Sequence, residues 1–149
     1  EMTSLGFENS LNPYEITPAD LACVLKGGAF VTEKNVFDRV VTNIQDGSVI
    51  GYKYYDFGDD FGSMTMEFSA KILGMGCDAV MHILIDGEDG EEIGCCRIGH
   101  DSSAIHTIVK SVTGRHAVFF KITTEYVGWM GEMFRGRNLF ELCSFVFLK

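Results

Sequence analysis

The sequence predicts an all-β fold: an antiparallel β-sandwich of the jelly-roll type with eight or nine strands. From Val49 to Phe147, apolar residues recur at every second position in one run after another. This is the period of a strand with one face in a core and the other in water. The segments between the runs are rich in Gly, Asp and Ser, as turns require. A length of 149 residues suits one domain that buries about two-thirds of its unfolded surface.

The clearest strand is expected at residues 63–72. Four polar side chains alternate there with five apolar ones, so the apolar set should face a core and the polar set water. The apolar set is Met64, Met66, Phe68, Ala70 and Ile72.

The remaining strands are expected wherever a similar run lies between turn residues. A first edge strand should cover residues 14–20, because Pro18 is tolerated only at an edge or a bulge. Gly87 to Gly90 should close one hairpin, and Thr113 with Gly114 another. Residues 1–12 are expected to be a linker remnant and residues 13–149 the module. The other expected strands are 37–43, 48–57, 79–86, 91–98, 104–112, 116–123 and 139–148.

Charge and hydropathy exclude several classes of partner. The formal net charge is −9, whereas a phosphate backbone or an anionic membrane attracts a basic surface. No apolar run approaches the roughly 20 residues of a membrane span, and the first residues lack the pattern of a signal peptide. We therefore expect no nucleic-acid partner and no membrane partner.

The cysteine content does not indicate a disulfide framework. The count of five is odd, and no pair has the C-x-x-C spacing of a zinc ribbon. The cysteines are expected to be small buried hydrophobic residues, which favours a cytoplasmic location, while secretion stays open. They are Cys23, Cys77, Cys95, Cys96 and Cys143.

No catalytic motif is present in the sequence. There is no G-x-S-x-G, no P-loop and no Gly-rich dinucleotide fingerprint, and the four histidines share no metal-ligand spacing. We expect no catalytic residues, and the chain is not expected to be an enzyme.

One connection differs from the others. Residues 124–137 form a long, Gly-containing segment with several aromatic and Met residues, among them Trp129, the only Trp of the chain. Long apolar loops in compact domains are usually functional. This segment is expected either to form a binding site or to cover an open end of the sandwich.

Four segments taken in order resemble family 6 carbohydrate-binding modules, over roughly residues 12–148. The first carries an Asn-Pro-Tyr lead, and the second is similar to the family pattern NGDWIEY followed by VDFG. The third resembles IEIRLD followed by DGELIG, and the fourth resembles VSGTHDLYLVF with the closing LFNLDWF. The segments are residues 12–20, 43–52 with 55–58, 81–86 with 89–94, and 112–120 with 139–145.

The resemblance implies a sugar site at one end of the sandwich with altered residues. Asn43 stands where the family has a loop Tyr, Glu141 where it has an Asn, and Ala104 or Ile105 where it has a Trp. The resemblance therefore leaves the long segment to supply the aromatic rings. The implied stacking residues are Trp129, Tyr126 and Phe134, and the implied hydroxyl contacts are Glu33, Asn43, Glu141 and Arg135.

The resemblance also implies a second site and a metal. On the concave sheet, Val49 and His82 stand where the family has a Trp and a Glu. The family's structural calcium would lie near Asp20 and the closing strand, where Cys143 replaces an acid. Calcium needs six or more oxygen ligands, so at most one structural calcium is expected, bound largely through backbone carbonyls.

The function implied is that of a non-catalytic module that targets a glycoside hydrolase, similar to family 43, to plant-type polysaccharide. Its partners would be an oligo- or polysaccharide and a parent catalytic domain on the same chain. The alternative is an interaction module that has lost sugar binding and packs on its parent enzyme or on a second copy. Val49 and Leu84 would then give the concave sheet an apolar docking face.

Overall fold

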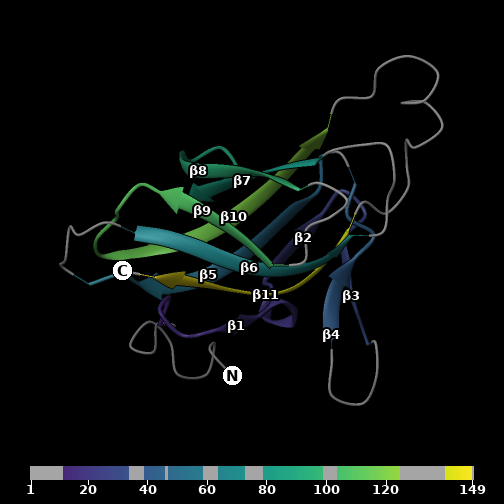
Figure 1. Ribbon diagram of the computed structural model, residues 1–149, viewed down its shortest axis with the longest axis horizontal. Helices are drawn as coiled ribbons and strands as arrows, with labels where there is room; N and C mark the ends of the chain where they lie inside the picture. Colours follow the sequence, from purple (N-terminus) through teal and green to yellow (C-terminus); the bar gives the residue numbers. More distant parts are fainter. Residues whose placement is uncertain are drawn as a thin grey trace.

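The computed structural model describes residues 12–33, 39–45, 47–58, 64–72, 79–98, 104–124 and 140–148. Within these ranges the chain forms eleven strands and one short 3₁₀ turn. The strands make two antiparallel sheets that stack face to face (Figure 1). The predicted all-β sandwich is confirmed.

One sheet has five strands, with β10 at its centre. Its central strand β10 pairs with β5 on one side and β7 on the other, while β2 and β8 are its edges. In spatial order the strands are β2 (Val24–Lys26), β5 (Val49–Asp56), β10 (Arg115–Thr124), β7 (Ala79–Ile85) and β8 (Glu91–Ile98).

The other sheet has six strands. The last strand of the chain, β11, lies at its centre and pairs with β6, β4 and the short β1. A 3₁₀ turn, η2 (Ala19–Leu21), follows β1. The strands are β3 (Phe30–Glu33), β4 (Arg39–Thr42), β11 (Phe140–Leu148), β6 (Met64–Ile72), β9 (Ala104–Val109) and β1 (Thr17–Pro18).

The two sheets meet at one side of the sandwich through their edge strands β8 and β9. The backbone amide of Lys110 donates to the carbonyl of Ile93 at 2.7 Å. The hydroxyl of Thr107 donates to the carbonyl of Cys95 at 3.0 Å. These bonds satisfy backbone groups that an edge strand would otherwise leave to water.

The core between the sheets is rich in aromatic side chains. The ring of Phe145 lies 4.8 Å from Tyr52 and 4.9 Å from Phe120, in edge-to-face arrangements that aromatic pairs prefer. Each such buried ring contributes roughly 1.5–3 kcal/mol of transfer free energy. On β6 the predicted core residues Met64, Met66 and Phe68 are buried there, as expected. The side chains of Ala70 and Ile72 lie outside the described residues.

Three sequence predictions about the strands need correction. Strands β2 and β3 were not predicted, because each has only three or four residues and shows no alternation. The first edge strand ends after two residues, where the chain turns into η2. Thr113 and Gly114 do not close a hairpin, since β9 and β10 belong to different sheets. Local turn chemistry is the same for a hairpin and for a crossing between sheets.

The described cysteines carry free thiols, but two of them are not buried. Cys23 and Cys95 are exposed, so the expectation of buried cysteines is wrong for these two. Cys96 packs against the core, and burial raises the pKa of its thiol to about 12. No helix in the described part of the chain is long and apolar enough to cross a membrane.

Candidate ligand-binding face

A second apolar cluster lies on the outer face of the five-stranded sheet, separate from the core. Its members alternate along their strands with core residues, so their side chains point away from the sandwich. Each is less than a tenth exposed because the others and their neighbours cover it. The cluster contains Val49, Leu84, Ala117 and Phe119, with Val24 and Tyr54 packed against it.

The register of the strands brings these residues into one row. Phe119 on β10 pairs with Gly51 on β5 and with Leu84 on β7, and Val24 on β2 also pairs with Gly51. A β-carbon on Gly51 would lie 2.6 Å from ring atom Cε2 of Phe119. The ring therefore occupies the space that any other residue at position 51 would fill.

The hairpin turn between β7 and β8, residues 86–90, folds over this face. Asp86 adopts a positive φ of 70°, and its amide donates to the carbonyl of Ala117 at 2.9 Å. Gly90 is required at the other end, since a β-carbon there would lie 1.8 Å from the carbonyl oxygen of Ile85. These contacts fix the direction in which Glu88 leaves the turn.

Glu88 meets Lys26 from the opposite edge of the sheet. The Lys26 Nζ donates to Glu88 Oε1 at 2.5 Å. In spatial order β2 and β7 are three strand spacings apart, or roughly 14 Å. The hydrogen bond from Lys26 lowers the pKa of the Glu88 carboxyl below its ordinary value, and the positive charges of Lys26 and Lys121 act in the same direction.

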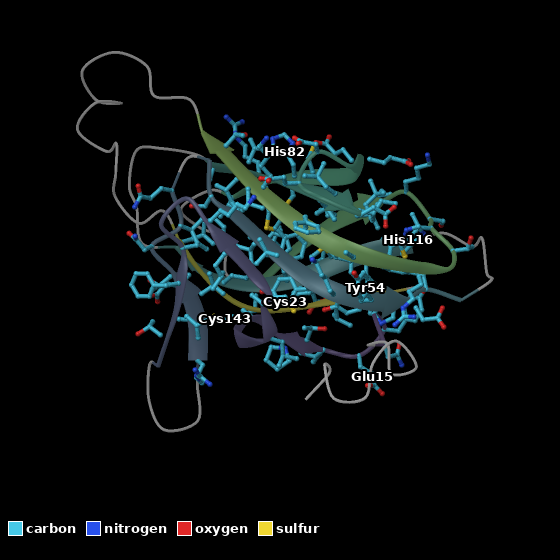
Figure 2. The ribbon with its side chains drawn as sticks, turned by 180° about the vertical axis from the view of Figure 1, so that it is seen from behind. Glu15, Cys23, Tyr54, His82, His116 and Cys143 are labelled. Carbon is cyan, nitrogen blue, oxygen red and sulfur yellow. The ribbon has the colours of Figure 1, made fainter. Side chains whose placement is uncertain are left out.

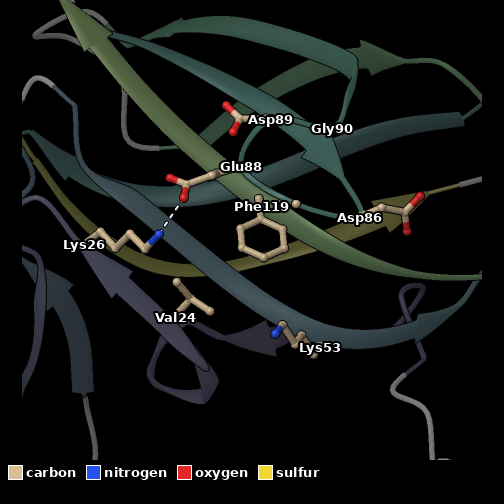
Figure 3. A pocket seen from close by; sticks show the side chains of 9 residues that line it. Val24, Lys26, Lys53, Asp86, Glu88, Asp89, Gly90 and Phe119 are labelled. Carbon is tan, nitrogen blue, oxygen red and sulfur yellow. Dashed lines mark hydrogen bonds and ion pairs between the residues drawn. The ribbon is translucent and has the colours of Figure 1, made fainter.

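Two adjoining pockets lie on this face, and together we call them the outer-face groove. Figure 3 shows the first of them. The first, of about 530 Å³, has Phe119 and Val24 in its floor and Lys26 and Lys53 at its side. The second, of about 330 Å³, lies over β10, β7 and β8. Glu88, Asp89 and Gly90 line both pockets, so the hairpin turn stands between them. The second pocket is further lined by His82, Leu84, Glu92, Lys121 and Thr123.

Fixed polar side chains line the second pocket. The Nδ1 of His82 lies 2.6 Å from Glu92 Oε1, and its Nε2 lies 2.9 Å from the hydroxyl of Thr123. Figure 2 shows His82 and His116 at separate places on this side of the molecule. His116 is held by Asp86 at 2.9 Å. The groove therefore offers an apolar floor with oriented hydrogen-bonding groups around it.

In the described ranges no three His, Cys, Asp or Glu side chains gather as a metal site would require. Such a groove can bind a ligand that has both apolar and hydroxyl-bearing surfaces.

At one end of the six-stranded sheet, the structure brings together two residues that the sequence predicted for a sugar site. Glu141 is buried on β11, and the hydroxyl of Thr42 donates to its Oε2 at 2.8 Å. Asn43 follows Thr42 directly, with a positive φ of 57°. Its Nδ2 donates to the carbonyl of Gly28 at 2.9 Å, and its Oδ1 accepts from Gln45 at 3.0 Å. Asn43 and Glu141 thus lie on neighbouring strands at the same end.

The other predicted site residues are not brought to this point by the described structure. Glu33 pairs with Arg39 on β4. It lies three residues along β3 from Phe30, which pairs with Thr42, so it is roughly 10 Å along the strand from that pair. Ile105 faces the core. The predicted residues Tyr126, Trp129, Phe134 and Arg135 lie outside the described residues.

The implied calcium position is only partly described. Asp20 lies in η2, which follows the pairing of Pro18 with Ser144 on β11. The neighbouring Cys143 offers a sulfur atom where a hard cation needs oxygen. The thiol of Cys143 instead points to the carbonyl of Glu141, at 3.9 Å. A structural calcium near Asp20 therefore stays a prediction.

The sequence reading named Val49, His82 and Leu84 on this face but not Phe119, although one signal for Phe119 was present. In β10, residues Val118, Phe120 and Ile122 form the core face, and Lys121 and Thr123 lie on the polar face. Phe119 is an aromatic residue on that polar face. An aromatic side chain out of phase with the core pattern indicates a second apolar surface.

The comparisons with known proteins agree with the fold. No protein-family model matches the sequence, and no curated protein does. Among solved structures, a family 6 carbohydrate-binding module from Clostridium cellulolyticum in complex with xylose superposes with a TM-score of 0.72 at 22% identity. The match covers 93% of this chain and 100% of the Clostridium module. A β-1,3-glucan-binding family 6 module from Bacillus halodurans gives 0.74 at 17% identity, covering 95% and 100%.

A third structure is a family 43 glycoside hydrolase, an arabinoxylan arabinofuranohydrolase from Bacillus subtilis solved with cellotetraose. It gives a TM-score of 0.75 at 24% identity and covers 95% of this chain, which spans only 28% of the hydrolase. The resemblance read from the sequence is thus confirmed for the fold. The chain has the β-sandwich fold of the family 6 carbohydrate-binding modules over almost its whole described length.

Proposed function

We propose that this chain is a non-catalytic carbohydrate-binding module that targets a glycoside hydrolase to plant-type polysaccharide. The observation that carries the proposal is the outer-face groove, with an aromatic ring in its floor and fixed polar side chains at its sides. It occurs on a fold whose solved members were crystallised with sugars or bind glucan.

The groove's chemistry matches what a sugar presents. A pyranose has C–H faces that pack on flat apolar surfaces and hydroxyl groups that need directed partners. Phe119 and Val24 supply the apolar surface, and Lys53, Asp89 and Thr123 are donors or acceptors within reach of a ligand there. The net charge of −9 supports the exclusion of nucleic acid and of anionic membranes as partners.

The end of the sandwich is the second place where we propose sugar contacts. Asn43 and Glu141 lie together there, and Glu141 is the second residue of β11, just after the segment that holds Trp129. In this proposal Trp129, Tyr126 and Phe134 stack on the sugar, while Arg135 and Glu33 contact its hydroxyls. In the same proposal the module needs no cofactor, and it binds at most one structural calcium ion, near Asp20.

The parent enzyme is proposed from one comparison. The family 43 hydrolase from Bacillus subtilis contains a segment with this fold beside the rest of its chain. A module of this kind would act by keeping its enzyme near an insoluble substrate, which raises the effective concentration.

The alternative of a docking module is not favoured by the groove. Val49 and Leu84 are indeed apolar, but charged side chains such as Glu88 and Lys121 line the pockets on this face. A docking face would present such residues as an open apolar patch.

The test is calorimetry of the purified chain with xylohexaose, arabinan, β-glucan and galactan. We expect at least one of them to bind with a dissociation constant of about 1 mM or lower, corresponding to about −4 kcal/mol. Phe119→Ala tests the groove and Trp129→Ala tests the end of the sandwich. Ile108→Ala is the control, because Ile108 is 82% exposed on the other sheet. If no glycan binds, or if Phe119→Ala and Trp129→Ala both bind as the Ile108→Ala control does, the proposal is wrong.

A further inference from the structure

Phe119 lies on the outer face of its sheet and lines a pocket, yet it is only 7% exposed. Lys26 reaches in from β2 on one side, and the hairpin turn carrying Glu88 reaches in from the other. Figure 3 shows the ring of Phe119 beside the ion pair that joins them. The aromatic platform is therefore built into the groove but largely covered.

Glu88, Asp89 and Gly90 line both pockets, and of these three Glu88 is the residue that reaches across to Lys26 on β2. The first pocket lies toward β2 and β5, the second toward β7 and β8, and β10 runs beneath both. The face from β2 to β7 is only roughly 14 Å wide. With the ion pair formed, each pocket covers only a part of that width and is therefore short. With the ion pair broken, the Glu88 side chain is free to leave, and the two pockets can join over β10.

The ion pair is weak enough to be opened by a ligand. The side chains of Lys26 and Glu88 are 55% and 36% exposed. Exposed pairs of this kind are screened by salt and contribute little to stability. A ligand that gains contacts with Phe119 and with both pockets can offset the loss of one such pair.

We propose that the Lys26–Glu88 ion pair determines the length of glycan that the outer-face groove accepts. Closed, it divides the groove into two short pockets, each suited to a short saccharide. Open, it exposes Phe119 and admits an extended saccharide across the sheet. This inference rests on the proposed function of the groove and adds a rule of specificity to it.

The chain offers a matched control pair away from the groove. Lys110 Nζ lies 2.5 Å from Glu91 Oε2, the same distance as in the pair of interest, with side chains 65% and 51% exposed. Neither residue lines the two pockets. Glu91→Gln therefore removes an equivalent surface ion pair without changing the groove.

The experiment measures binding of a disaccharide and a hexasaccharide by calorimetry, with xylobiose, xylohexaose, laminaribiose and laminarihexaose as probes. Glu88→Gln and Lys26→Met should each bind a hexasaccharide ~2- to 5-fold more tightly than the wild type. Disaccharide binding should not change, and Glu91→Gln should bind all probes as the wild type does. In the wild type, hexasaccharide binding should strengthen between about 0.01 M and 1 M salt, while in Glu88→Gln it should not.

A second measurement reports on the ion pair without any glycan. The methyl resonances of Val24 and Leu84, one from each pocket, should shift in Glu88→Gln and stay unchanged in Glu91→Gln. If the methyl resonances do not move, or if hexasaccharide binding is equal in wild type and Glu88→Gln, the inference is overturned while the proposed function stands. If neither the wild type nor any variant binds a probe, the groove is not a glycan site. The proposed function of the groove and the proposed effect of the ion pair on glycan length are then both wrong.

Discussion

The ring of Phe119 lies directly over Gly51, with Cε2 only 2.6 Å from where a β-carbon at position 51 would be. Because Gly51 on β5 has no side chain, the aromatic ring of Phe119 can lie on the sheet in the floor of the groove. The two residues are 68 positions apart in the sequence and adjacent only through the pairing of β5 with β10.

Gly51→Ala should displace the Phe119 ring and weaken any glycan that binds in the groove. We expect the free energy of unfolding to fall by about 1–3 kcal/mol, the usual cost of overpacking, measured by urea denaturation. Phe119→Leu serves as the partner variant, because it removes the ring that the new methyl group would meet. The double variant should lose less than the sum of the two single ones, and strict additivity would show that the two residues do not interact.

Tyr52→Phe should destabilise the fold through a single lost hydrogen bond. The buried hydroxyl of Tyr52 donates to the carbonyl of Ala19 in η2 at 2.8 Å. Without it the carbonyl keeps only the amide of Ala22 as a donor, at 3.3 Å, and the lost hydrogen bond should cost about 0.5–1.5 kcal/mol. Thermal unfolding should show a lower midpoint than in Tyr54→Phe, whose ring is only partly buried. Equal midpoints would mean that this bond contributes nothing.

Acid pH should open the groove in the wild type. The folded-state pKa of Glu88 is lowered from 4.5, chiefly by the hydrogen bond from Lys26. The ion pair is therefore intact above pH 4.5 and is lost as the pH falls through the lowered pKa. Hexasaccharide binding should strengthen in that range relative to Glu88→Gln at the same pH. An identical pH profile in the two proteins would contradict this.

Alkaline pH should destabilise the fold through two buried acids. Burial raises the pKa of the Cys96 thiol from 9.0 to about 12, and burial also raises the pKa of Tyr55 above its ordinary value of 10.0. The stability they contribute is complete below those ordinary values and is lost as the pH rises above them. The urea midpoint should fall as the pH rises from 9.0 toward about 12 in the wild type and in Cys95→Ala, and less steeply in Cys96→Ala. A decline that is the same in all three would exclude Cys96 as a cause.

Calcium should stabilise Cys143→Asp more than the wild type. A ligand that binds only the folded state raises the midpoint with its concentration, and an aspartate supplies the hard oxygen that the thiol lacks. The measurement is a melting curve in EDTA and in calcium for both proteins. If neither protein responds to calcium, the predicted structural calcium near Asp20 is absent.

Much of the fold could be predicted because its strands have a strong local signal. The alternation on β6 and β8 predicted both strands to within one residue. The turn at Gly87 to Gly90 likewise predicted the hairpin that joins β7 and β8. The short strand β2, by contrast, is stabilised by pairing with β5 rather than by its own pattern. Such pairing cannot be read from three residues.

The groove was harder to predict because its parts are distant in the sequence. Val24, Phe119 and Glu88 meet only through the order of the strands in the sheet. On β5 the alternation also breaks, since the register shifts between His116 and Val118 on the paired strand β10. A shift of this kind changes which residues share a face.

The bonds between β8 and β9 bear on how this molecule behaves when many copies crowd together. Edge strands are where one sheet can add to another and start an aggregate. In the described part of the chain, the edge strands β8 and β9, one from each sheet, are joined through the hydrogen bond from the Lys110 amide to the Ile93 carbonyl. Intermolecular strand addition is thereby directed to the opposite side, where β2 and β3 offer only three and four residues. Under the proposed function, copies gathered on one polysaccharide surface would thus have only these short edges through which to join.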